Sequence, residues 1–147
     1  MKNLLLILVA AIVLAACQGS DKPGGKDLSY EERLKASTDS SNFTSIQWLD
    51  STSRSLGTEK EGKKVEVLYH FKNTGKHNLI LKDVSASCGC TTPDWPKRAI
   101  APGEEDVIKA IFDSKGKVGP NVKQVFVTAN TLPQSSTTLS FSVEIIK

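Results

Sequence analysis

The residues of this chain best suited to chemistry are two cysteines separated by a single glycine, Cys88 and Cys90. They follow the alternating segment Leu79–Ala86, so they lie in a loop at the end of a predicted strand. Three roles fit this pair. It could form a local disulfide or remain two unreactive thiols, it could be a thiol–disulfide exchange centre, or it could be part of a metal site. In the chain-entropy model, closing so short a loop stabilises a fold by only about 1.6 kcal/mol, so a structural disulfide here would chiefly fix a turn.

The exchange and metal alternatives need additional groups. A redox thiol usually has its pKa lowered by a helix N-terminus or a neighbouring cation. Two threonines and a proline follow Cys90 directly, so no helix is expected there, and Lys97 or Arg98 could help only if the loop folds back. A site for zinc or cuprous copper would need His70 or His77, which are predicted to lie on an outward strand face and in a turn. The sequence therefore favours the structural role and predicts no bound metal, with the other two roles kept as alternatives.

A third cysteine, Cys17, follows a segment typical of an export signal. Lys2 gives a positive start, and residues 4–14 form an apolar run well short of the roughly 20 residues that span a bilayer. Leu14-Ala15-Ala16-Cys17 then resembles the lipobox of bacterial lipoproteins, in which small residues admit the processing protease and the thiol takes a diacylglyceryl group. The resemblance implies that residues 1–16 are a cleaved signal peptide. It also implies that Cys17 carries covalent diacylglycerol and an N-acyl chain, with no other cofactor.

These acyl chains would place the protein in the cell envelope. Three chains are ample for stable anchoring, because two membrane signals normally suffice. Gln18 follows the cysteine, which resembles lipoproteins sent to an outer membrane, with the periplasmic or surface face left open. The formal charge of +3 and the scattered lysines lack the concentrated basic face of a nucleic-acid binder. The expected partners are membrane lipid, through Cys17, and an envelope protein or glycan, with no nucleic acid.

Residues 17–42 are predicted to form a flexible tether. The segment is rich in Gly, Ser, Lys and Asp and has too few apolar residues to bury. A flexible coil of this length would span roughly 25–30 Å root-mean-square, enough to lift a domain off a membrane. Ser29-Tyr30-Glu31-Glu32 fits a capping box, which makes one or two helical turns around Tyr30–Ala36 the alternative. So short a helix is marginal by itself, and the flexible spacer is favoured.

Residues 43–147 have the pattern of a single all-β domain. Short alternating segments are separated by Gly, Pro and Asn, which favours an immunoglobulin-like Greek-key sandwich of about seven strands. The alternation slips before Val84, as at a β-bulge, and Ala101-Pro102-Gly103-Glu104 is predicted to turn. Val122–Ala129 is apolar on both faces, as in a strand covered on both sides or at a sheet centre. The predicted inward-facing residues are Val65, Val67, Tyr69, Phe71, Ile108, Ala110, Phe112, Leu139, Phe141, Val143 and Ile145.

Three short motifs resemble the bacterial family named domain of unknown function 1573. They are Phe71-Lys72-Asn73-Thr74-Gly75, then Ser87-Cys88-Gly89-Cys90-Thr91 followed by Pro93, Trp95 and Pro96, and Ile100-Ala101-Pro102-Gly103-Glu104. The resemblance covers roughly Ser55–Ile146 and implies an immunoglobulin-like sandwich, in agreement with the strand pattern. It implies no activity, because none is established for the family.

Familiar catalytic patterns are missing from the sequence. It contains neither G-x-S-x-G nor a glycine loop for phosphate. The acidic cluster Glu104-Glu105-Asp106 is interpreted as the polar lead-in to a strand. We therefore expect not an enzyme but a lipid-anchored cell-envelope protein with a non-catalytic binding or structural module. The alternative is an envelope thiol-redox or metal-handling lipoprotein that acts through Cys88 and Cys90.

Overall fold

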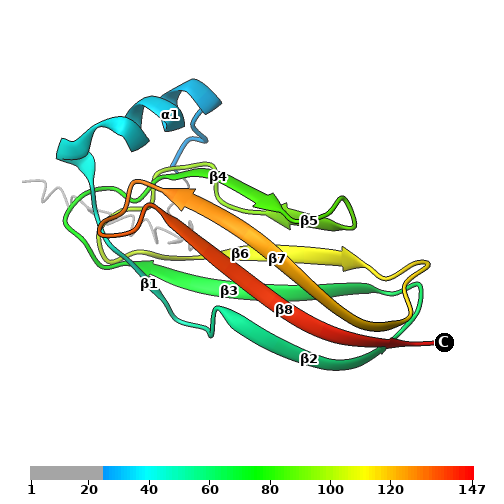
Figure 1. Ribbon diagram of the computed structural model, residues 1–147. Coiled ribbons are helices and arrows are strands. Elements are labelled where there is room, and N and C mark those ends of the chain that lie inside the picture. Colours follow the sequence, from blue (N-terminus) through cyan, green and yellow to red (C-terminus); the bar gives the residue numbers. More distant parts are fainter. Residues whose placement is uncertain (1–24) are drawn as a thin grey trace, which may run out of the picture.

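Two sheets of four strands face each other across a common core (Figure 1). The computed structural model describes residues 25–147, so the predicted signal peptide, Cys17 and the start of the tether lie outside the described residues. The first sheet has the strand order β1 (Ile46–Trp48), β3 (Lys64–Asn73), β6 (Glu105–Asp113) and β5 (Thr91–Asp94). The second has the order β2 (Ser53–Lys60), β8 (Ser136–Ile146), β7 (Gly119–Ala129) and β4 (Leu81–Ala86). The predicted immunoglobulin-like sandwich is confirmed.

All neighbouring strands are antiparallel except β2 and β8, which run parallel. The slip predicted before Val84 is confirmed as a register shift in β4, between Leu81 and Asp83. The predicted turn before β6 is also confirmed. Its Glu104 N–H donates to the Ala101 carbonyl at 3.0 Å, and Gly103 adopts φ +81°, a left-handed conformation that favours glycine.

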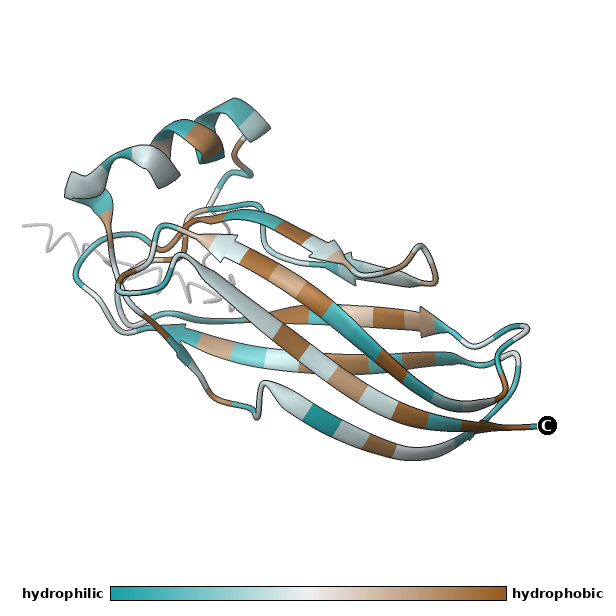
Figure 2. Ribbon diagram, viewed as in Figure 1, coloured by the Kyte–Doolittle hydropathy of each residue, from teal (hydrophilic) through white to brown (hydrophobic). Residues whose placement is uncertain are grey.

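The predicted inward-facing residues on β3, β6 and β8 are confirmed as the core, since all of them are buried. Figure 2 shows this alternation as brown and teal or pale bands along β7 and β8. Phe112 of the first sheet and Phe141 of the second meet edge to face, with ring centroids 6.1 Å apart. The two sheets therefore hold together through a continuous apolar layer.

β7 decides between the two alternatives predicted for Val122–Ala129. The strand lies inside its sheet, between β8 and β4, but only its inner face is buried. Val125 and Val127 point into the core, whereas Val122 and Phe126 are 68% and 41% exposed. The strand is therefore at a sheet centre, as the second alternative has it. It is not covered on both sides, because a two-layer sandwich buries one face of each sheet and apolar residues on the outer face stay exposed.

A helix occupies part of the predicted flexible tether. α1 (Tyr30–Thr38) starts with a complete capping box, in which the Ser29 N–H donates to the Glu32 carboxylate at 2.7 Å and the Ser29 hydroxyl accepts from the Glu32 N–H at 3.3 Å. A 3₁₀ turn, η1 (Ser40–Asn42), then leads into the sandwich. The favoured tether was thus wrong for these residues, because the capping box and contacts with β4 stabilise a helix that would be marginal alone. Within residues 25–147, no helix has the length and apolar character needed to cross a membrane.

The aromatic contact between the sheets gives the first prediction. Phe112→Ala should lower the free energy of unfolding by about 3–5 kcal/mol, because it leaves a cavity in the core. Phe126→Ala, on the exposed face of β7, is the matched control and should lower it by much less. Urea titration followed by tryptophan fluorescence measures both, and equal losses would contradict the assignment of core and surface.

Candidate functional site

The first and third family motifs meet at one end of the sandwich, where Asn73 is fully buried. Its Nδ2 donates to the carbonyls of His77 and Ile100, at 2.8 and 2.9 Å. Its Oδ1 accepts from the Thr44 hydroxyl at 2.9 Å and from the Gly75 N–H at 3.1 Å. Because one amide satisfies four groups from three segments, the asparagine of the F-K-N-T-G motif has a structural role.

The third motif bonds directly to the first. The Asn73 N–H donates to the Glu104 carbonyl at 2.9 Å, and the Asn73 carbonyl accepts from the Gly103 N–H at 2.8 Å. The glycine of the first motif is needed for space. A side chain on Gly75 would clash with Thr44 Oγ1 and would lie 2.6 Å from the Ser45 nitrogen. Both motifs are therefore explained by packing and hydrogen bonding at this end.

Cys88 and Cys90 form a disulfide in the loop that carries the chain from β4 to β5, and so from one sheet to the other. The Thr91 N–H donates to the Cys88 carbonyl at 3.2 Å, and the Asp113 N–H donates to the Cys90 carbonyl at 2.9 Å. Thr91 is buried, and its hydroxyl lies 3.7 Å from Cys88 Sγ. The structure thus contains the local disulfide, the first of the three arrangements considered for C-G-C-T.

The groups that the other two arrangements need have different neighbours. Arg98 forms ion pairs with two carboxylates, and the Lys97 ammonium lies 3.0 Å from the centroid of the Trp95 ring. His70 Nδ1 lies 2.7 Å from a carboxylate oxygen of Asp50. Across residues 25–147, no group of three or more His, Cys, Asp or Glu side chains is placed to hold a metal ion.

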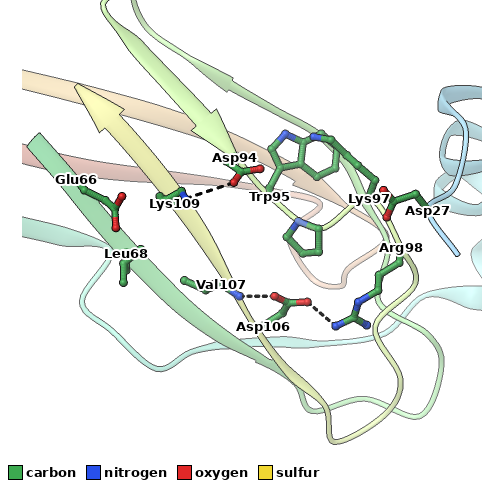
Figure 3. A pocket seen from close by; sticks show the side chains of 11 residues that line it. Asp27, Glu66, Leu68, Asp94, Trp95, Lys97, Arg98, Asp106, Val107 and Lys109 are labelled. Atoms are coloured by element: carbon green, nitrogen blue, oxygen red, sulfur yellow. Dashed lines mark hydrogen bonds and ion pairs between the residues drawn. The ribbon is translucent and has the colours of Figure 1, made fainter. Parts of the chain in front are cut away.

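The outer face of the first sheet carries an open groove (Figure 3). It has a volume of about 630 Å³. Leu68 and Val107 form an apolar floor, and charged side chains with Trp95 form the rim. We call it the Trp95 groove, lined by Asp27, Glu66, Leu68, Asp94, Trp95, Pro96, Lys97, Arg98, Asp106, Val107 and Lys109.

Strand register brings the groove together from distant parts of the sequence. Lys109 on β6 lies opposite both Leu68 on β3 and Asp94 on β5, and its ammonium is 3.6 Å from the Asp94 carboxylate. Sequence reasoning missed this site. Leu68 and Lys109 are about 40 residues apart, and no sequence pattern links two outward-facing positions on different strands. Only the register of the strands shows that they are neighbours.

The Trp95 ring is flanked by two cations. The Lys97 ammonium lies 3.0 Å from the ring centroid and the Arg33 guanidinium carbon lies 5.1 Å from it. Both distances suit cation–π attraction. Burial and then the charge of Arg33 lower the pKa of Lys97, although nearby carboxylates oppose this. The indole is therefore covered by the protein's own side chains rather than open.

An arginine clamp fixes the wall of the groove. Arg98 pairs with Glu104 at 2.7 Å and with Asp106 at 2.6 Å, and all three side chains are less than one-fifth exposed. Asp106 also accepts from the Val107 N–H at 2.8 Å (Figure 3). Burial raises the pKa of Glu104. Hydrogen bonds from Arg98 and the Ala101 N–H, together with the charge of Arg98, lower it by more, so the net shift is downward. The clamp pre-forms the groove by holding the loop after β5 against β6.

Residues 47–145 match the family model described as "Protein of unknown function (DUF1573)". The chain belongs to this family. The DUF1573 motif residues each have a physical role in this chain. Asn73 supplies a buried amide, Gly75 allows a close backbone approach, Gly103 makes a left-handed turn, and Cys88 and Cys90 form the disulfide loop. No curated protein matches the chain.

Solved structures share the fold of this DUF1573 chain at low identity. A protein of unknown function from Porphyromonas gingivalis W83 is 14% identical with a TM-score of 0.63, over 72% of this chain and 49% of that one. This chain thus spans about half of that protein. The ASH/PapD-like domain of human CEP192 is 13% identical, with a TM-score of 0.56, over 97% and 99% of the two chains. The YadV chaperone is 19% identical, with a TM-score of 0.50, over 69% and 52%. These similarities show the fold alone.

The clamp predicts a pH-dependent stability. The pKa of Glu104 is lowered in the folded protein from an ordinary value of 4.5, so its stabilising effect is present above that value and is lost as pH falls through the folded pKa. The stability difference between the wild type and Glu104→Gln should therefore be largest near neutral pH and shrink in acid. Urea titrations across this range measure it. In an Arg98→Ala background the pH dependence should largely vanish, and a difference that stays constant with pH would refute the clamp.

Proposed function

We propose that this chain is a lipid-anchored protein of the bacterial cell envelope, and that its immunoglobulin-like domain is a non-catalytic binding module. The Trp95 groove carries the binding proposal, because it is a pre-formed concavity on an outer sheet face. The lipobox at Leu14–Cys17 supports the anchor, and Gln18 supports the outer membrane as its place. The expected partners are membrane lipid, through Cys17, and an envelope protein or glycan in the groove.

The chemistry of the groove suits recognition of a macromolecular surface. Leu68 and Val107 offer an apolar floor that a partner side chain could cover. The rim carries both signs of charge. Because the Arg98 clamp already orders the wall, binding of a ligand loses less conformational entropy there. An apolar centre with a polar rim is the usual anatomy of a protein interface.

The anchor predicts labelling at one cysteine. Cells fed a radiolabelled or clickable fatty acid should label the wild-type protein, which should sediment with membranes. Cys17→Ser should lose the label and leave the membrane fraction. The matched control is the double variant Cys88→Ser/Cys90→Ser, which should keep the label. Label that persists in Cys17→Ser would contradict the anchor.

The groove predicts a contact that depends on its floor. A photoreactive amino acid at Leu68 should give a discrete adduct in intact cells, whereas the same group at Val122, exposed on the opposite sheet, should not. No adduct from Leu68, or the same adduct from both positions, would count against the groove as the binding site.

A thiol-redox or metal-handling lipoprotein is the second candidate, because the Cys88–Cys90 disulfide is present. The double variant Cys88→Ser/Cys90→Ser separates the two. For a binding module it should fold, lose at most about 1.6 kcal/mol of stability and keep the Leu68 adduct. Loss of the adduct in a folded variant would favour the second candidate.

A further inference from the structure

The segment before the sandwich docks beside the Trp95 groove. We call residues 25–38 the strap. The Leu28 N–H donates to the Lys97 carbonyl at 3.1 Å, and Arg33 Nε donates to the Lys82 carbonyl on the edge strand β4 at 3.4 Å. Asp27 itself lines the groove (Figure 3). The strap is thus one wall of the candidate site.

Docking of the strap shortens the connection to the anchor. Asp27 follows Cys17 by ten residues, which reach at most about 33–36 Å when fully extended. If residues 17–42 were all free, the same limit would be about 85–95 Å. The groove wall is therefore tied to the lipidated cysteine by a short span, comparable to the roughly 36 Å length of β7.

The groove chemistry favours a protein segment over the other occupants. Trp95 is the one aromatic side chain that lines it, and Lys97 and Arg33 cover its ring, so little is left for a sugar to stack on. Its charged lining has four acids against three bases, which gives no attraction to anionic headgroups. An aliphatic side chain flanked by charges of both signs would match the floor and the rim.

We propose that the docked strap keeps the Trp95 groove at the membrane surface, and that its partner is a protein of the same membrane with an exposed segment within about 35 Å of the bilayer. This inference rests on the proposed function, because it requires the lipid on Cys17. It also requires a docked strap. None of the α1 residues is buried, so polar contacts hold the strap: the Leu28 N–H bonds to Lys97, and Arg33 is the side chain that reaches both β4 and Trp95.

Energy transfer in vesicles tests the placement. With Cys17 acylated and Cys88 and Cys90 paired, a cysteine at Val107 in the groove or at Lys115 in the turn after β6 is the one free thiol for a fluorophore. Transfer to headgroup-labelled lipid should be stronger from position 107 than from position 115. Arg33→Ala should lower the transfer from position 107. Lys35→Ala, which removes the same charge from an exposed site on α1, should not. Equal transfer from both positions would overturn the placement.

Spacer length tests the partner. A flexible insert of about 36 residues after Asp21, combined with Arg33→Ala, should reduce the Leu68 photo-adduct about 15-fold, because effective concentration falls with roughly the −3/2 power of linker length. The adduct should be a membrane protein. An unchanged yield, or an adduct with a glycan or a lipid, would overturn this inference. Loss of fatty-acid labelling at Cys17 would instead overturn the proposed function, so the two failures are distinguishable.

Discussion

Two buried asparagine amides hold together the end of the sandwich on which the rest of the structure depends. Asn130 Oδ1 accepts from the Ile80 N–H at 2.7 Å, and its Nδ2 donates to the carbonyls of Asn42 and Asn78 at 2.7 and 2.9 Å. Asn73 does the same for the neighbouring loops. Buried backbone groups must be paired, and these loops lie beyond the reach of either sheet ladder. The amides replace the missing strand partners and so fix where each loop begins.

The groove inherits its rigidity from this end. Ile100 and Leu79 exchange two backbone hydrogen bonds, at 2.8 and 2.9 Å, beside the Asn73 amide. The loop after β5 is therefore held at Ile100 by the buried network and at Arg98 by two carboxylates. The solvent-exposed groove thus depends on buried contacts beneath it. The motif residues Asn73 and Ile100 hold the loop, and Trp95 and Pro96, which follow the C-G-C-T motif, line the groove.

The sequence predicted the structure correctly where a local pattern of residue types has one structural meaning. Alternation identified the inward residues of β3, β6 and β8, and proline with glycine identified the turn before β6, because both patterns are local. The sequence showed the capping box at Ser29. It could not show the contacts of Arg33 with β4 and Trp95 that help to hold the helix, because those residues are distant in the sequence. The groove was invisible for the same reason. Val122 and Phe126 are apolar yet exposed, because apolar character reports burial only on average.

The parallel pairing of β2 with β8 has a consequence for how the chain acquires its fold. Ser53 on β2 lies opposite Ser140 on β8, 87 positions later, and β8 is the one strand to which β2 is paired. The second sheet consequently cannot close until β8 has been made. Contacts of such long sequence separation form late and slowly. Closing of the second sheet is therefore a late event in the folding of this chain.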